Sequence, residues 1–241
     1  MHTSKGWQLR HALLLAVTAI ATTACAPEPA RTALEAQKVA GIALSEWTAR
    51  WWRWADAREI PPYLDPDGQL CHLGQSSPVW FLAGTDGQFQ AQRECEVPEG
   101  KHVLLPVINM ISYGIDGDES CRYLQQGAAM NNDHLVSAVV LLDGKPLADV
   151  RERRVSSDGC FRMDPGDKTS MLAAADGYWI LLDPLPRGRH TLSVGANYDT
   201  RQGGDYSGMQ QSFEYVLYVG GKGSMALDAH GASPFNGRSA P

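Results

Sequence analysis

Residues 45–55 read SEWTARWWRWA and place four tryptophans within eight positions. On a 3.6-residue period Leu44, Trp47, Trp51 and Trp54 fall on one stripe, and an apolar stripe at this spacing is typical of a buried helix face. Trp52 lies about 100° around the helix from Trp51. The stretch therefore predicts a helix whose tryptophans mostly fill a core, with Trp52 the most exposed of them.

The helix has expected limits on both sides. Ser45 is a suitable N-cap, and the helix should end before Pro61, because a residue that precedes proline is disfavoured in the α region. Arg50 and Arg53 flank the stripe and can lie over indole rings as cation–π partners.

Beyond Gly68 the pattern changes to short apolar or alternating runs separated by turn residues, which favours an all-β sandwich or barrel. In SFEYVLYVG, residues 212–220, alternate positions are apolar, as on a strand with one buried face. The candidate strands are PVWFLAG (78–84), QFQAQREC (88–95), HVLLPVIN (102–109), LVSAVVLLDG (135–144), ERRVS (152–156), GYWILLD (177–183), RHTLSVG (189–195) and SFEYVLYVG.

Three local features refine this pattern. Pro106 lies inside a strand-like run and predicts an edge or a bulge there. Asp143 and Gly144 form a hairpin-type turn signal, and ESCRYLQQGAAM (119–130) is compatible with a short helix inserted between strands. We expect a mainly β fold, a single-domain antiparallel β-sandwich, Ig-like or jelly-roll-like, with the Trp-rich helix packed on it. The sandwich should span 45–220, and 221–241 should be a flexible tail.

The N-terminus predicts export. Lys5 and Arg10 precede ten apolar residues, ALLLAVTAIA (12–21), and the small-residue stretch TTACA, which together resemble a signal peptide over residues 1–24. The apolar run is shorter than the roughly 20 residues of a membrane span. Residues 25–44 should form a Pro- and Ala-rich tether, although LEAQKVAGIAL (34–44) is also compatible with a helix that Gly41 interrupts.

Two processing sites compete within this leader. Ala19-Ile20-Ala21 fits ordinary signal cleavage, whereas TTAC ending at Cys25 resembles a bacterial lipobox in which Thr22 replaces the usual Leu. We favour lipidation of Cys25, because five cysteines then leave an even four in an oxidising compartment. Ala26, in place of Asp after the cysteine, favours the outer membrane, facing the periplasm or the cell surface.

The four remaining cysteines can pair in three ways. We expect neighbours to pair, Cys71 with Cys95 and Cys121 with Cys160. The formal net charge is −6, and loss of the two basic residues of the leader makes it −8. Such an acidic chain is disfavoured as a partner of nucleic acid or anionic lipid.

Several segments together resemble a family of exported bacterial proteins to which no activity is assigned. The resemblance rests on EWTARWWRWA (46–55), DPDGQLCHLGQSSPVWFLAG (65–84), RECEVPEGKHVLLPVIN (93–109) and DGYWILLDPLPRGRHTLSVG (176–195), and it spans roughly residues 45–220. It implies one β-rich secreted domain and nothing catalytic. This chain adds MISYGIDGDESC (110–121) and the loop ANYDTRQGGDYSGMQQ (196–211), which are candidate places for individual function.

Metal and catalytic motifs are weak in this sequence. Asp116, Asp118 and Glu119 offer clustered oxygen ligands for Ca²⁺, but their spacing matches no complete metal loop and a solvated acidic turn is the simpler interpretation. The chain contains neither HExxH nor GxSxG, and GGKGS (220–224) lacks the full phosphate-loop spacing. His190 is expected to be hydrogen-bonded beside the core. We therefore expect no cofactor, with calcium as the alternative.

Aromatic side chains give the binding hypothesis its best support. Sugars lie on flat aromatic faces, and the candidates for such contacts are Trp52, Tyr198 and Tyr206, whereas Trp80 and Trp179 are expected in the core. The preferred function is binding of a glycan or an envelope partner. The first alternative is a polysaccharide hydrolase or lyase that uses two carboxylates, drawn from Asp116, Glu119, Asp176 and Asp183. A purely structural role is the second alternative.

Overall fold

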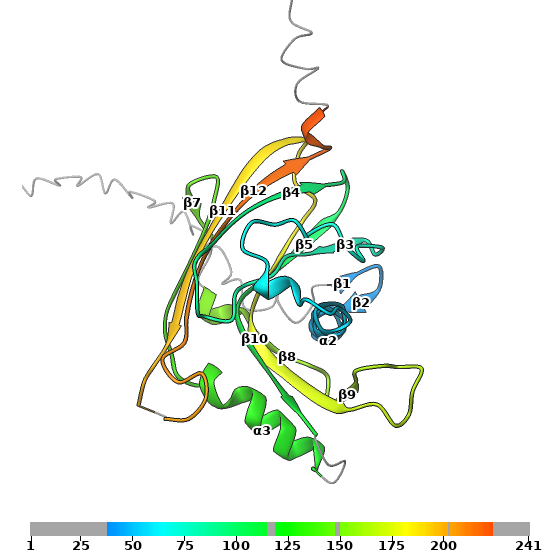
Figure 1. The fold of residues 1–241 in the computed structure, drawn as a ribbon, viewed down its shortest axis with the longest axis vertical. Coiled ribbons are helices and arrows are strands. Elements are labelled where there is room, and N and C mark those ends of the chain that lie inside the picture. The colour runs from blue at the N-terminus through cyan, green and yellow to red at the C-terminus, as the bar shows by residue number, and fades with distance from the viewer. Residues whose placement is uncertain (1–37, 115–118, 148–149, 202, 224–241) are drawn as a thin grey trace, which may run out of the picture. The chain divides into compact units, whose positions relative to one another are not determined.

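Two five-stranded sheets face each other, and the Trp-rich helix covers the outer face of one of them (Figure 1). This computed structural model describes residues 38–114, 119–147, 150–201 and 203–223. The leader, Cys25, most of the tether, Asp116, Asp118 and most of the C-terminal tail lie outside the described residues. All the described residues belong to one compact unit. The mainly β sandwich with an N-terminal Trp-rich helix is confirmed.

The first sheet has the order β3-β5-β10-β8, and β9 also pairs with β10. The second has the order β4-β12-β11-β6-β7. Strands of the first sheet are β3 (Val79–Phe81), β5 (His102–Tyr113), β8 (Arg154–Ser156), β9 (Phe161–Arg162) and β10 (Leu172–Leu182). Strands of the second are β4 (Ala91–Val97), β6 (Leu135–Leu142), β7 (Lys145–Pro146), β11 (Gly188–Tyr198) and β12 (Gln210–Val219).

The sheets are not wholly antiparallel, which corrects one expectation. The pairs β3–β5 and β4–β12 are parallel, whereas the pairs in the middle of each sheet are antiparallel. The chain leaves β3, crosses to the second sheet as β4 and returns as β5, so β3 and β5 run in the same direction. Alternation along a strand encodes which face is buried, not the direction of the neighbouring strand.

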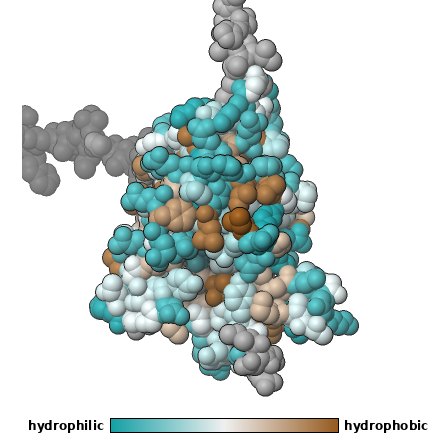
Figure 2. Space-filling view, in the orientation of Figure 1, coloured by the Kyte–Doolittle hydropathy of each residue, from teal (hydrophilic) through white to brown (hydrophobic). Residues whose placement is uncertain are grey.

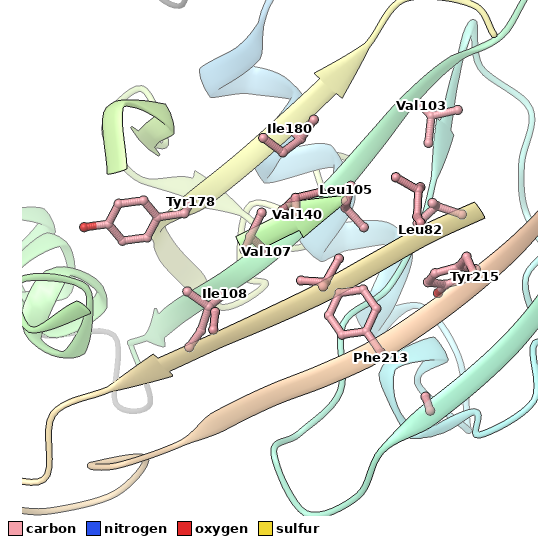
Figure 3. Close-up of a cluster of buried hydrophobic side chains, with 14 of the residues drawn as sticks. Leu82, Val103, Leu105, Val107, Ile108, Val140, Tyr178, Ile180, Phe213 and Tyr215 are labelled. Carbon is pink, nitrogen blue, oxygen red and sulfur yellow. The ribbon is translucent and has the colours of Figure 1, made fainter. Parts of the chain in front are cut away.

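The space between the sheets is filled by alternating strand residues (Figure 3). Phe213 and Tyr215 of β12 belong to the same buried cluster as Leu105 of β5 and Ile180 of β10, and all four are at most 2% exposed. Trp80 lies in this core and Trp179 lies in the second core beneath the helix, as expected. The surface shown in Figure 2 is mostly hydrophilic, with apolar side chains gathered near its middle.

Helix α2 (Leu44–Asp56) forms the second core with the outer face of the first sheet. Trp47, Trp51 and Trp54 are buried, as predicted. Trp52 is also buried, at 8% exposed, because its ring packs edge-on against Trp51 with centroids 4.9 Å apart. Its expected exposure was therefore wrong. Arg50 lies over the Trp47 ring as predicted, whereas Arg53 lies over Phe161 instead of an indole.

The segment before α2 is a hairpin, not a helix. Strands β1 (Lys38–Val39) and β2 (Ile42–Ala43) pair through a turn in which Ala40 and Gly41 both have positive φ, as in a tight hairpin turn. Val39 is 5% exposed, so the folded part begins before residue 45. The chain enters α2 directly from β2, so Ala43 is the N-cap and Ser45 lies inside the first turn, which corrects the predicted cap.

Three further local predictions, the inserted helix, the turn at Asp143 and Gly144, and a hydrogen-bonded His190, agree with the structure. Helix α3 (Cys121–Asn132) follows the Ser120 cap, and the 3-10 turns are η1 (Pro62–Leu64) and η2 (Val150–Arg153). Asp143 and Gly144 have the positive φ values of a hairpin turn between β6 and β7. The ring nitrogens of His190 lie 2.8 Å from Asp143 Oδ2 and 2.8 Å from the Pro186 carbonyl oxygen.

The disulfides join Cys71 to Cys95 and Cys121 to Cys160, the neighbour pairing predicted from the sequence. The first ties the segment before β3 to β4, and the second ties the start of α3 to the turn before β9. Disulfides persist in oxidising compartments, so they indicate an exported protein. None of the described helices combines the length and the apolar character that crossing a membrane requires.

A bulge in β5 decides which side chains reach the α2 side of the first sheet. On β10, Trp179 pairs with Pro106 and the residue before it, Tyr178, pairs with Ile108. Val107 is therefore an extra residue of β5 that has no partner on β10. The predicted bulge at Pro106 is therefore confirmed. Bulges re-aim the side chains that follow them. Beyond this one, Ile111 and Tyr113 pack against the helix core while Ile108 and Met110 face the second sheet.

Gly177 makes this register possible, because it pairs with Asn109 of the bulged strand. A Cβ added at Gly177 would lie 2.5 Å from Asn109 Cβ. We expect Gly177→Ala to lower the free energy of unfolding by about 1–3 kcal/mol, as overpacking does. Gly195→Ala in β11 is the control, because no atom lies within 4 Å of its added Cβ. Urea unfolding measures both, and equal midpoints for the two variants would contradict this account.

Candidate binding pocket

A pocket of about 280 Å³ lies where the end of α2 meets η1, the bulged half of β5 and two loops. Its size is at the lower end for small-molecule sites. Five aromatic side chains dominate its wall, and the polar groups come from the loop after β3 and from β5. The lining residues are Trp51, Trp52, Tyr63, Gly84, Thr85, Asp86, Asn109, Met110, Ile111, Tyr113, Tyr206 and Met209.

The two tryptophans of the wall are held in place by the helix core. Trp51 Nε1 donates a hydrogen bond to the Leu82 carbonyl at 2.7 Å, and its ring lies edge-on to Trp179 with centroids 5.5 Å apart. Trp52 packs on Trp51, and its buried Nε1 has no hydrogen-bond partner. The pocket therefore has a fixed aromatic wall, and one of its indoles carries a buried donor without a partner.

Tyr113 lines the pocket, and Asp56 lies behind its hydroxyl. The Tyr113 hydroxyl donates to the carboxylate of Asp56, the last residue of α2. Burial raises the pKa of Asp56, and the hydrogen bond from Tyr113 opposes this shift. Burial also raises the pKa of Tyr63, with the negative charge of Asp56 as a smaller cause. These groups lie close enough to feel each other's charge, and both tyrosines stay neutral at physiological pH.

The loop after β3 is anchored by hydrogen bonds to a residue of the second sheet. Gln211 of β12 accepts from the Thr85 backbone N–H at 2.8 Å and donates to the Thr85 carbonyl at 2.6 Å. Asp86 follows and accepts from the Gln88 backbone N–H. Asn109 lies opposite on β5, and its buried Nδ2 has no partner. The pocket thus combines aromatic faces with an uncommitted amide and a carboxylate.

Tyr206 comes from the predicted functional loop between β11 and β12. It adopts a positive φ of 63° and is 57% exposed. Its carbonyl accepts from the Met209 backbone N–H at 3.0 Å, which holds the loop tip in a turn. The expectation that Tyr206 is a surface aromatic agrees with this position. Tyr206 and Trp52, two of the three predicted binding residues, line the same pocket.

Tyr198, the third candidate, lies elsewhere. It is 1% exposed, and its hydroxyl donates to Asn132 Oδ1 at the end of α3. The prediction of a surface position was wrong, because β11 continues to Tyr198 and its inward alternation through Leu192, Val194 and Ala196 includes this residue. That alternation was present in the sequence and could have placed Tyr198 in the core.

The described carboxylates among those proposed for catalysis or metal binding lie apart from one another. Asp176 is 4% exposed and paired with Arg154 at 2.8 Å, while the Asp183 side chain is 97% exposed. Asp116 and Asp118 lie outside the described residues, and Glu119 Oε2 is buried without a partner. Within the described part of the chain no three His, Cys, Asp or Glu side chains gather as metal ligands.

Two other hollows of about 500 Å³ each are present. One lies between α3 and the β8–β10 edge, where Asp176 is matched by Arg154, and is more open than the aromatic pocket. The second shares Asp86, Tyr206 and Met209 with the aromatic pocket. We therefore take the aromatic pocket, with the hollow beside it, as the candidate site.

Comparison with known proteins gives little further guidance. No protein-family model matches the chain, and no curated protein matches its sequence. The solution structure of amebosin is similar at 11% sequence identity, and the match covers 54% of this chain and 95% of that one. Its TM-score is 0.17, so it carries no argument about fold or function.

Proposed function

We propose that this chain is a binding protein of the cell envelope that takes a sugar ring in the aromatic pocket. The observation that carries the proposal is the aromatic wall of Trp52, Tyr63, Tyr113 and Tyr206, in a pocket that Asn109, with its unpartnered Nδ2, also lines. Aromatic faces supply apolar contact, while a few convergent polar groups orient the ligand. A volume of about 280 Å³ suits one ring of a longer glycan.

Tyr206→Ala tests this site, because Tyr206 is largely exposed and its loss leaves the core intact. We expect the variant to bind its best glycan about tenfold more weakly, which corresponds to about 1.4 kcal/mol. Tyr123→Ala in α3 is the matched control, since Tyr123 is 62% exposed and lies outside the pocket. The measurement is a glycan array followed by calorimetry on the full protein in detergent. Equal affinities, or no glycan bound by wild type, would refute the proposal.

We further propose that a lipid on Cys25 holds the protein at the outer membrane. The lipobox-like TTAC and the even number of remaining cysteines support this, and those four are joined as two disulfides. Cys25→Ser should move the protein from the membrane pellet to the soluble fraction while its urea midpoint stays unchanged. Immunoblotting of both fractions measures the change, with the wild type processed in parallel. A Cys25→Ser protein that still pellets with membranes rules the anchor out.

A polysaccharide hydrolase or lyase is the second candidate function. Its support is Asp56, whose burial raises its pKa as in many general acids. Against it, Asp86 is the one carboxylate among the described lining residues, and Asp56 is engaged by Tyr113. Glycosidases need two carboxylates facing the scissile bond. If the wild type releases shorter products from a bound glycan and Asp56→Asn does not, the result would favour the enzyme over the binding protein.

A further inference from the structure

We infer that the aromatic pocket selects a sugar that carries a protonated amine over its neutral or acidic counterparts. This inference rests on the proposed glycan-binding function and adds that the bound sugar is positively charged. It is carried by the composition of the wall, the absence of basic groups among its described residues, and two donors left without partners.

The wall attracts positive charge. Trp52, Tyr63, Tyr113 and Tyr206 present rings from four separate segments of the chain. The face of an aromatic ring is negative, and a cation placed over it gains about 0.5–2 kcal/mol, most when the site is desolvated. Several rings around one small volume therefore favour a cation more than a neutral group of the same size.

Carboxylates strengthen this preference. Asp86 lines the pocket, Asp56 lies behind the Tyr113 hydroxyl, and Asp205 lines the adjoining hollow. None of the described residues that line the pocket is Lys, Arg or His. Elsewhere in the described chain, Arg154 forms ion pairs with both buried Asp176 and Asp133. The three carboxylates around the pocket have no such ion pair among the salt bridges of the described residues, so a ligand cation would supply their counter-charge.

The unused donors distinguish an amino sugar from a simple amine. Trp52 is 8% exposed with Nε1 unpartnered, and Asn109 Nδ2 is likewise buried and unpartnered. Both atoms are donors on residues that line the pocket, so a ligand oxygen that reaches them would satisfy them, whereas an alkyl ammonium ion has no acceptor. A sugar ring carries hydroxyl and ring oxygens beside its amine. An acidic sugar would instead place its carboxylate near Asp86 and Asp56, which costs free energy.

The test compares two ligands of equal length, a tetramer of β-1,4-linked glucosamine and its fully N-acetylated counterpart. Calorimetry on the full protein at mildly acidic pH, where the sugar amines are protonated, should give at least about tenfold tighter binding of the free-amine tetramer. Asp86→Asn should reduce this ratio severalfold. Asp158→Asn is the matched control, since it removes the same charge from an exposed residue that lines none of the pockets described above, and it should leave the ratio unchanged.

Each alternative result has a separate meaning. If the acetylated tetramer binds as tightly as the free amine, or if Asp86→Asn and Asp158→Asn have equal effects, the charge selectivity is overturned while glycan binding stands. If neither tetramer binds and the glycan array is also negative, the proposed function fails together with this inference.

Discussion

Trp51→Ala is expected to lower the free energy of unfolding by about 3–5 kcal/mol, the cost of truncating a large buried aromatic. Trp51 is 1% exposed and its ring contacts Trp52, Trp54 and Trp179. Truncation also leaves the Leu82 carbonyl without its indole donor. Because small domains are stable by only about 5–15 kcal/mol, the loss is a large fraction of the total.

Urea unfolding followed by circular dichroism measures this effect. Met130→Ala in α3 is the control, because Met130 is 52% exposed and surface substitutions usually change stability by less than about 0.5 kcal/mol. A loss below about 1 kcal/mol for Trp51→Ala would show that α2 is not packed on the first sheet as described.

The second large effect is expected at Arg93, a charged residue of β4 that is 2% exposed. Its guanidinium donates to the Asp65 carbonyl at 2.6 Å, to the Ala83 carbonyl at 2.6 Å, and to the Gly84 carbonyl at 2.8 Å. It also reaches the Tyr215 hydroxyl at 2.9 Å. Arg93 therefore fixes the segment that leads into the Thr85–Asp86 side of the pocket.

Arg93→Met keeps an unbranched apolar stem and removes every donor. The Ala83 carbonyl keeps the Tyr215 hydroxyl as a donor, but the Asp65 and Gly84 carbonyls lose theirs. A buried carbonyl left unsatisfied costs about 1–3 kcal/mol, so we expect a loss of about 3–5 kcal/mol in total. Tyr215→Phe removes one hydroxyl of the same network and should cost about 1–2 kcal/mol. The midpoints of urea unfolding rank the two variants. An Arg93→Met protein as stable as wild type would contradict this assignment.

The sequence was informative where a pattern is local. The tryptophan stripe at 47, 51 and 54 predicted the packed helix, and the alternation in 212–220 predicted a strand with one buried face. Cysteine parity left three pairings open, and the favoured pairing of neighbours is the one observed. The first two signals depend on the periodicity of a single element, and the third depends on the number of cysteines. None of them requires knowledge of contacts between distant parts of the chain.

The candidate site was only half predicted, because most of its wall is assembled by long-range contacts. Trp52 and Tyr206 were candidates, but Tyr113 lies beyond the β5 bulge, Asp86 follows the loop that Gln211 holds, and Tyr63 comes from η1. Pro106 predicted the bulge, yet not which side chains it would re-aim. The hairpin at residues 38–43 was missed because a helix-like composition concealed the Ala40–Gly41 turn.

The central claim is that the pocket beside Trp52 binds a sugar, and the indole N–H signals of ¹⁵N-labelled protein test it most directly. Trp52 Nε1 and Trp80 Nε1 are both buried without hydrogen-bond partners, but Trp80 lies between the sheets and does not line the pocket. On addition of the glucosamine tetramer we predict that the Trp52 signal shifts while the Trp80 signal stays in place. A saturating titration that leaves Trp52 unshifted, or that shifts backbone signals of α3 instead, would contradict the account.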